Sequence, residues 1–167
     1  ESEGEGLVGF IGEGAKGRRE ATTRLLNQAF PKVRHLMDVV GTVTVRVPTA
    51  DLLAAVKRVS LVAERNTPLR MLIEDDHIAL EAATGDQAHA SEAIEAQVDV
   101  VGEEKSIEAA GFNPHYLLDA LGALDAPYAH FSFTAPGKPC LITGLATIDG
   151  DQLLDYRHVI MLMRLPS

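Results

Sequence analysis

Two stretches of the sequence repeat one order of elements, and this repeat constrains the fold more than any other feature. In the first stretch, "GTVTVRV" at residues 41–47 alternates apolar and polar side chains, which is typical of a strand. Apolar residues then recur at helical spacing over about residues 49–64, where Thr49 or Asp51 can cap a helix. Three strand-like segments follow, beginning at Leu69, His77 and Ala93. The first stretch therefore predicts a βαβββ unit.

The second stretch has the same order. "SIEAAGF" at residues 106–112 predicts a strand, and "NPHYLLDALGAL" predicts a helix with Asn113 as its cap and Pro114 at its first position. Three more strand candidates follow, at residues 128–134, 139–144 and 157–165. Because helices and strands of this kind each have an apolar face to bury, we predict an α+β domain in which two helices pack on antiparallel sheets.

The residues before this repeat form a separate pattern. "LVGFI" at residues 7–11 is strand-like, "GEGAKG" is typical of a turn, and "REATTRLLNQ" at residues 19–28 predicts a second extended segment. Two strands alone cannot bury a face, so we expect them to be the end of a larger unit that precedes Glu1. "AFPKVRHLMD" at residues 29–38 suits a crossing segment between two modules.

The chain is acidic, with 24 acidic and 15 basic side chains and a net charge of −9. This excess does not exclude nucleic acid as a partner, because net charge is a sum over the surface and one face can still be basic. The single cysteine, Cys140, cannot form an internal disulfide and is expected to be a buried thiol. No apolar run is long enough to span a bilayer, and the acidic start "ESEGEG" is unlike a signal peptide. We expect a cytoplasmic protein with no membrane partner.

No residue pattern indicates catalysis or a cofactor. The six histidines are scattered, without the spacing of metal ligands on a helix. Asp75 and Asp76 lie in a predicted turn, where aspartate is favoured by backbone hydrogen bonding. "GEGAKG" lacks the Lys-Ser/Thr end of a phosphate-binding loop and does not open a helix. We therefore expect no enzyme, no metal site and no cofactor.

Other features indicate contacts with partners. Lys57 and Arg58 lie off the apolar stripe of the first helix and are expected to face outward, as the residues of any solvated helix face do. Leu61 and Val62 extend the apolar surface of that helix beyond one stripe, which indicates a second contact, for example with another subunit. The run from Val159 to Leu165 is apolar except for one arginine, so it needs either burial in a sheet or a partner.

Four segments, in order along the chain, resemble the bacterial sliding clamp family, the β subunit of DNA polymerase III. They are "TTRLLNQAFPKVRHLM", "VSLVAERNTPLRMLIE", "FNPHYLLDALGAL" and "HVIMLMRL". The family has at these places a Phe-Pro-x-Tyr/Phe-Arg crossing, an apolar helix end before a Val-Arg-Leu-like strand, a Phe-Asn-x-x-Tyr-Leu helix start and a Met-Pro-x-Arg-Leu-like terminus. The matches span residues 22–165 and lie on the doubled βαβββ layout. The resemblance implies the DNA-clamp (processivity) fold.

The resemblance implies that residues 30–167 are the third, C-terminal domain of a clamp subunit and that residues 1–29 are the last two strands of the middle domain. In this family, three similar domains per subunit and two subunits form a ring around duplex DNA, with helices lining the hole. Lys57 and Arg58 would then face DNA phosphates without reading bases. The longer protein would be a non-enzymatic processivity factor in DNA replication.

The family also binds short linear peptides of the replicative polymerase, the clamp loader and repair polymerases in a pocket between the middle and last domains. The residues that match this pocket are Pro31, His35, Leu36, Asn113, Tyr116, Gly137, Pro139, Val159, Ile160, Met161, Leu162, Met163 and Arg164. Leu162 stands where the family usually has proline, and His35 stands where arginine or lysine is common. Apolar walls with a few polar groups suit the anchoring of a Leu or Phe side chain.

For the homodimer of the full-length protein, the resemblance points to Leu61 and Val62 at the helix end. It also points to Glu92 and Glu95 near an edge strand, which would face basic groups of the next subunit. Without the first domain, this chain should not form a ring.

An alternative function is a small-ligand-binding α+β domain whose apolar terminus closes an internal cavity. That alternative requires residues 159–164 to be covered by their own domain. A hydrolase has only scattered carboxylates in its favour.

Overall fold

The computed structural model describes residues 6–15, 17–26, 28–63, 67–84, 88–102 and 107–165. The chain divides into two compact units, Glu1–Lys32 and Val33–Ser167, which are described separately. The first unit contains an antiparallel hairpin of β1 (Leu7–Gly14) and β2 (Gly17–Arg24), so the two predicted strands are confirmed. Nearly all side chains of the hairpin are exposed, because two strands offer too little surface to bury a face.

The second unit follows the predicted order of elements. Its first half contains a short helix α1 (Arg34–Met37), then β3 (Val43–Pro48), α2 (Thr49–Val59), the 3-10 turn η1 (Ser60–Val62), β4 (Leu69–Ile73), β5 (His77–Thr84), β6 (Ala88–Glu95) and β7 (Gln97–Val100). Its second half contains β8 (Ala109–Phe112), α3 (Pro114–Ala123), β9 (Tyr128–Phe133), β10 (Cys140–Leu145) and β11 (Gln152–Ile160). Both βαβββ units are therefore present, with β7 as an additional strand in the first.

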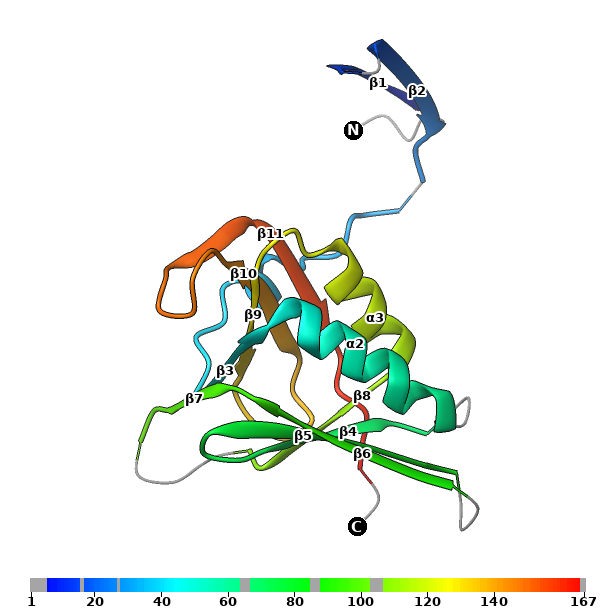
Figure 1. Ribbon diagram of the computed structural model, residues 1–167. Coiled ribbons are helices and arrows are strands. Elements are labelled where there is room, and N and C mark those ends of the chain that lie inside the picture. Colours follow the sequence, from blue (N-terminus) through cyan, green and yellow to red (C-terminus); the bar gives the residue numbers. More distant parts are fainter. Residues whose placement is uncertain are drawn as a thin grey trace. The chain divides into compact units, whose positions relative to one another are not determined.

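The strands form two antiparallel sheets that combine both halves of the repeat. The five-stranded sheet has the order β11-β10-β9-β3-β7, and the four-stranded sheet has the order β6-β5-β4-β8. Thus β3 and β7 from the first half join the sheet of the second half, while β8 joins the sheet of the first half. This exchange of strands makes the two halves one unit, with the four-stranded sheet beneath the helices in Figure 1.

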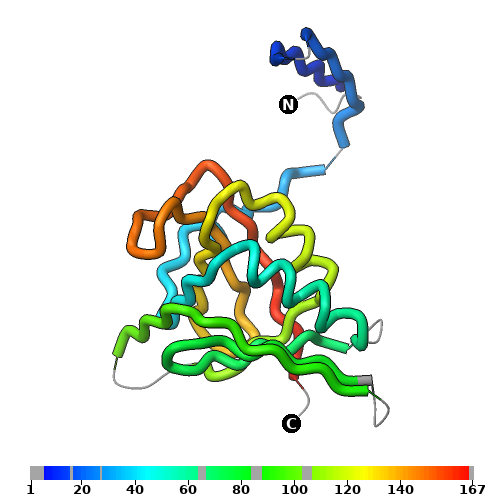
Figure 2. Tube along the Cα trace, in the orientation of Figure 1, coloured from blue at the N-terminus to red at the C-terminus, as the bar shows by residue number. Residues whose placement is uncertain are grey.

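The core lies between the helices and the sheets. α2 is amphipathic, and it buries Leu52, Val56 and Val59 at helical spacing, while α3 buries Leu117 and Leu121. The two helices lie side by side (Figure 2). Three phenylalanines fill the centre, with ring centroids 6.2 to 6.4 Å apart: Phe112, Phe131 and Phe133. The predicted α+β fold with two helices on antiparallel sheets is confirmed.

The structure corrects three details of the predicted elements. The helix expected to reach residue 64 ends at Val59, and neither Thr49 nor Asp51 caps it, because the capping position is Pro48 and no side chain bonds there. The strand expected to start at Ala93 is two strands, β6 and β7, which belong to different sheets and are separated by Ala96. The alternation of side chains continues across this break, so periodicity alone cannot reveal it.

The third correction concerns the end of the chain. The predicted last strand covers residues 157–165, whereas β11 begins at Gln152 and ends at Ile160. Beyond it, residues 161–165, which we call the C-terminal tail, make one isolated β-bridge, between Met163 and Gly111 of β8. The tail therefore leaves the five-stranded sheet and reaches the edge of the four-stranded one. Among the residues that the structure describes, no helix is long and apolar enough to cross a membrane.

Candidate partner-binding site

The C-terminal tail is fastened to β8 by its backbone. The Met163 N–H donates a hydrogen bond to the Gly111 carbonyl at 2.8 Å. Gly111 is needed at this point, because a Cβ built on it would lie 2.7 Å from the Met163 carbonyl oxygen and 3.0 Å from Leu165 Cδ2. Any larger residue would push the tail away from the sheet.

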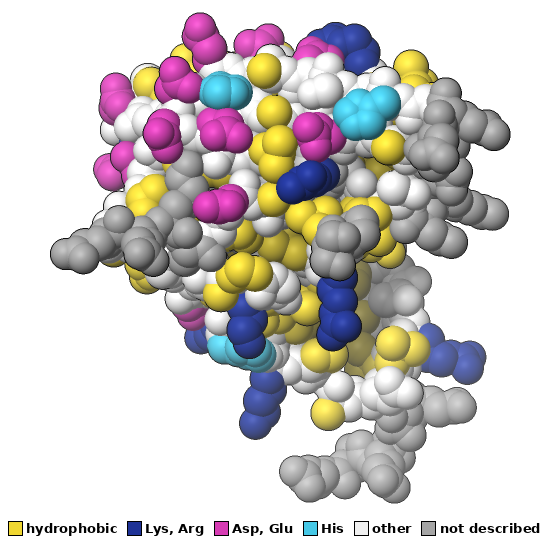
Figure 3. Space-filling view, turned by 90° about the horizontal axis from the view of Figure 1, so that it is seen from below, with side chains coloured by type: hydrophobic (Ala, Val, Ile, Leu, Met, Phe, Trp, Pro, Cys, Tyr) yellow, Lys and Arg dark blue, Asp and Glu magenta, His cyan; other side chains and the backbone are white. Residues whose placement is uncertain are grey.

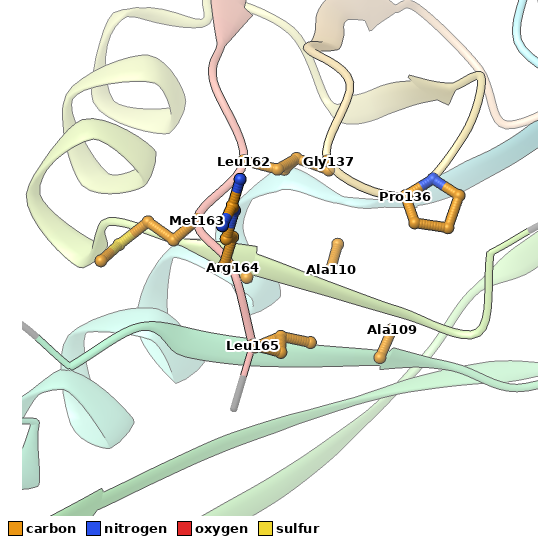
Figure 4. A pocket seen from close by; sticks show the side chains of 9 residues that line it. Ala109, Ala110, Pro136, Gly137, Leu162, Met163, Arg164 and Leu165 are labelled. Atoms are coloured by element: carbon orange, nitrogen blue, oxygen red, sulfur yellow. The ribbon is translucent and has the colours of Figure 1, made fainter. Parts of the chain in front are cut away.

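A groove of about 410 Å³ runs beside the tail. Its walls are the tail, the edge of β8 and the turn between β9 and β10, where Gly137 has a positive φ of 72°. Figure 4 shows its lining residues, which are mostly small or apolar: Ala109, Ala110, Gly111, Pro136, Gly137, Leu162, Met163, Arg164 and Leu165. Such a groove can hold an apolar side chain of a partner and offers few polar groups to orient it.

The tail presents different side chains to its two sides. In Figure 4, Leu162 points toward the turn at Pro136 and Gly137, whereas Met163 points the opposite way, toward α3. Tyr116 lies on α3 and is 59 % exposed, and Met161, at the start of the tail, is 63 % exposed. The tail therefore offers apolar groups both to the groove and to the α3 side.

The structure brings together only part of the predicted pocket. Gly137, Leu162, Met163 and Arg164 line the groove. The other predicted residues of the second unit do not line it: His35, Leu36, Asn113, Tyr116, Pro139, Val159, Ile160 and Met161. Pro31 belongs to the first compact unit, where its side chain is exposed.

Two of these predicted residues have clear roles of their own within the domain. Ile160 is 2 % exposed and belongs to the core, so its prediction as a partner contact is corrected. The Asn113 side-chain oxygen accepts a hydrogen bond from the His115 N–H at 3.0 Å and caps α3, as the sequence predicted. This cap stays compatible with a partner contact because the Asn113 side chain is only half-buried.

Five lining residues escaped the sequence analysis: Ala109, Ala110, Gly111, Pro136 and Leu165. Four of them are small or cyclic residues, which carry no pattern of their own. The three that lie on β8 meet Leu162 and Met163 only because the tail crosses to that strand, a contact between segments about fifty residues apart in the chain. Leu165 was part of the apolar run, which was its only available signal.

The second candidate surface is the outward face of α2. Lys57 and Arg58 are both exposed, as predicted. Arg58 Nε donates to Glu92 Oε2 at 3.0 Å, and a second guanidinium nitrogen bonds Glu92 Oε1. This hydrogen-bonded pair lowers the pKa of Glu92 and raises the pKa of Arg58, so both groups stay charged. The predicted DNA contact of Arg58 and the predicted subunit contact of Glu92 thus involve two residues already bound to each other.

The residues predicted for the dimer lie near one edge of the domain. Leu61 is 84 % exposed in η1, which contacts the edge strand β6. Val62 is half-buried and packs against the core, so it is less available than Leu61. Glu92 and Glu95 lie on β6 itself. Their roles in an interface stay predictions.

The face of the four-stranded sheet that points away from the helices is acidic over part of its area. Figure 3 shows acidic side chains gathered there beside an area of hydrophobic ones. Exposed carboxylates in the strands of the four-stranded sheet and in the segments next to them include Glu74, Asp75, Asp76, Glu95 and Glu108. The uneven distribution agrees with the view that the net charge is a sum over unlike faces.

Two titratable groups are buried away from these surfaces. Burial raises the pKa of the Cys140 thiol well above its usual value, which makes it a poor nucleophile. Burial also lowers the pKa of His130 to about 4, with a further contribution from Arg46, so the imidazole is neutral at pH 7. Within the described parts of the chain, no three His, Cys, Asp or Glu residues lie close enough to hold a metal ion.

Comparison with known proteins places this geometry in a family. The family model for the DNA polymerase III beta subunit, C-terminal domain, matches residues 32–164. The beta sliding clamp of Streptomyces coelicolor is 43 % identical over 162 residues, which cover 97 % of this chain and 41 % of that protein. A beta sliding clamp homolog, GriR, of Streptomyces muensis is 35 % identical over 148 residues, which cover 89 % of this chain and 38 % of the homolog.

A solved structure shows the same fold. The DNA polymerase III beta subunit of Thermotoga maritima matches with a TM-score of 0.73 at 23 % identity, over 92 % of this chain and 39 % of that one. The chain thus spans about two fifths of the length of the relatives it matches. Since the family model covers most of the second compact unit, the chain belongs to the DNA polymerase III beta subunit family and carries its C-terminal domain.

Proposed function

We propose that this chain is the last domain of a processivity clamp, preceded by the final hairpin of the middle domain. The clamp would encircle duplex DNA without acting as an enzyme and would tether the replicative polymerase, the clamp loader and repair polymerases through short linear motifs. The observation that carries this proposal is the apolar groove at the C-terminal tail, whose lining shares four residues with the pocket expected from the family. Such a protein acts inside the cell, on DNA.

The same framework proposes roles for the other surfaces. Residues 1–29 would complete the middle domain, which agrees with a family match that begins at residue 32. The sequence upstream of Glu1 tests this, since two more pairs of βαβββ units would support it and an unrelated fold would contradict it. α2 would face the DNA, and the edge formed by Leu61 and β6 would meet the next subunit.

The small-ligand alternative is not favoured. It requires the segment from Val159 to Arg164 to be covered by its own domain. Instead Met161 is 63 % exposed and Arg164 is exposed, and the groove beside them opens to solvent. The C-terminal tail is therefore accessible to a partner and does not close an internal cavity.

A labelled peptide of the QLxLF type tests the partner site. We expect Leu162→Ala to weaken binding by about 1 to 3 kcal/mol, because Leu162 presents its side chain to the groove as an anchor contact. The measurement is fluorescence anisotropy of the labelled peptide titrated with protein.

Leu154→Ala is the matched control for this experiment. Leu154 is 56 % exposed on β11 and does not line the groove, so its truncation should leave peptide affinity unchanged. Equal peptide affinities of the wild-type and Leu162→Ala proteins would mean that the groove is not the peptide-binding site.

A further inference from the structure

The ion pair between Arg58 and Glu92 sits in a negatively charged groove between α2 and β6. This groove has a volume of about 460 Å³, and its lining includes Asp51 and Glu95 as well as the pair itself. Its charged lining residues are therefore three carboxylates and one guanidinium. The two-point geometry, with Nε and a terminal nitrogen each bonded to one carboxylate oxygen, is the arrangement in which arginine binds carboxylates best.

Lys57 stands in a different environment on the same helix. Successive residues of an α-helix lie about 100° apart around the axis, so Lys57 and Arg58 cannot face the same way. Arg58 shares the β6 side with Asp51, which lies about two turns earlier along the helix, whereas Lys57 is exposed and does not line this groove. In the described parts of the chain, Lys57 has no ion pair.

We propose that Glu92 holds Arg58 at the β6 margin of α2 and cancels its charge, so that Lys57 is the cation this helix offers to duplex DNA. The inference rests on the proposed function, in which α2 faces the DNA. The pair uses two of the five N–H groups of Arg58, so a phosphate that approaches the others must also approach the Glu92 carboxylate. That carboxylate lies well within the Debye length of about 10 Å at 0.1 M salt and would repel the phosphate. Fewer phosphate contacts keep the attraction weak, as sliding along DNA requires.

The test is the salt dependence of binding between this chain and a short fluorescein-labelled duplex. The slope of log affinity against log salt changes by about 0.9 for each DNA phosphate that the protein neutralises. Lys57→Gln should make the slope shallower by about that amount. Glu92→Gln frees Arg58 and should make the slope steeper by about 0.9, and the double variant Glu92→Gln with Arg58→Gln should return it to the wild-type value.

Glu81→Gln is a matched control for the change in net charge. Glu81 also pairs with an arginine, Arg70, at 3.6 Å. Its neighbours Leu80 and Ala82 are buried in the core, so the Glu81 side chain lies on the opposite face of the sheet from α2. This variant should leave the slope unchanged. A slope as steep with Glu81→Gln as with Glu92→Gln would mean that only total charge matters, which would overturn the inference.

The outcomes separate this inference from the proposed function. If Lys57→Gln lowers the slope and Glu92→Gln does not raise it, α2 contacts DNA but Glu92 does not restrain Arg58, and the inference is wrong. If Lys57→Gln has no effect, or if no variant binds DNA even at low salt, the DNA-facing role of α2 is wrong as well. The Arg58 Nε–H signal in NMR spectra reports the pair directly, and an unchanged signal in Glu92→Gln would contradict it without any DNA present.

Discussion

Gly111 decides how closely the C-terminal tail can approach the edge of β8. The groove at the tail is built largely from residues with little or no side chain. The absence of a Cβ at Gly111 allows the Met163 carbonyl group to lie directly against β8. A methyl group there would overlap the Met163 carbonyl oxygen at 2.7 Å. The backbone atom cannot swing aside as a flexible side chain could, so the whole tail would have to move.

We therefore expect Gly111→Ala to weaken binding of the QLxLF-type peptide several-fold, because it shifts Met163 and Leu165 out of the groove wall. Anisotropy titration measures this, and thermal unfolding checks the fold. Gly122→Ala is the matched control, since a Cβ at Gly122 meets nothing within 4 Å and Gly122 lies inside α3. That change should leave peptide affinity alone and stabilise the domain by about 0.5 to 1 kcal/mol. A Gly111→Ala protein with unchanged affinity would show that the position of the tail does not set the site.

At the scale of elements, a buried polar cluster joins the strands of the five-stranded sheet on the face opposite the core. His130 Nδ1 lies 3.4 Å from the hydroxyls of Ser132 and Thr143, and Arg46 lies opposite His130 on the neighbouring strand. Arg46 also donates to the Ile148 carbonyl at 3.3 Å, which ties the loop after β10 to this face. The sheet is thus covered on both sides, which explains why every residue of β9 after Tyr128 is buried.

This cluster predicts a pH-dependent stability. The pKa of His130 is lowered to about 4 in the folded protein, from 6.5 in the unfolded chain, chiefly by burial. The unfolded chain therefore binds more protons between these two values, so stability is fully present above pH 6.5 and falls as the pH drops toward 4. The slope from this one group is at most about 1.4 kcal/mol per pH unit.

Chemical denaturation between pH 4 and 7 measures this slope. We expect His130→Gln to be less stable than the wild type at pH 7 but to show a flatter stability curve below pH 6.5, because the titrating group is gone. His115→Gln, at an exposed position on α3, should keep the wild-type slope. Parallel curves for the wild-type and His130→Gln proteins would mean that another group titrates there.

The elements also show what the sequence could and could not predict. Helical spacing and period-two alternation identified both helices and the order of the strands, because each element buries one regular face. The division between β6 and β7 at Ala96 is set by which sheet each strand joins, and no local pattern records that choice. The ion pair of Arg58 with Glu92 joins residues 34 positions apart, so it too depends on the folded arrangement.

At the scale of the whole molecule, the domain can be explained from its sequence more fully than its site can. Two βαβββ patterns were enough to predict an α+β domain, since each had to bury its helix against strands. The site depends on the tail leaving β11 at Ile160 and meeting β8. The apolar run alone could not predict which strand the tail would meet. The contacts of the proposed ring are harder still to predict from this sequence, because they join this domain to another subunit.

Leu61 gives the sharpest test of that ring. Its side chain is 84 % exposed and absent from the core, so Leu61→Ala should not lower the stability of the domain, whereas truncating Val62 would also remove core packing. In a protein that joins this domain to the two domains proposed to precede it, we expect Leu61→Ala to weaken dimerisation at least tenfold, which corresponds to about 1.4 kcal/mol. Sedimentation velocity at several concentrations measures the shift toward monomers.

Leu154→Ala is the control for this experiment, because it removes the same side chain from another exposed site and should leave the dimer intact. If both variants remain dimeric over the same concentrations, the edge at η1 and β6 is not the subunit interface, because an exposed leucine buried on assembly cannot be lost without cost.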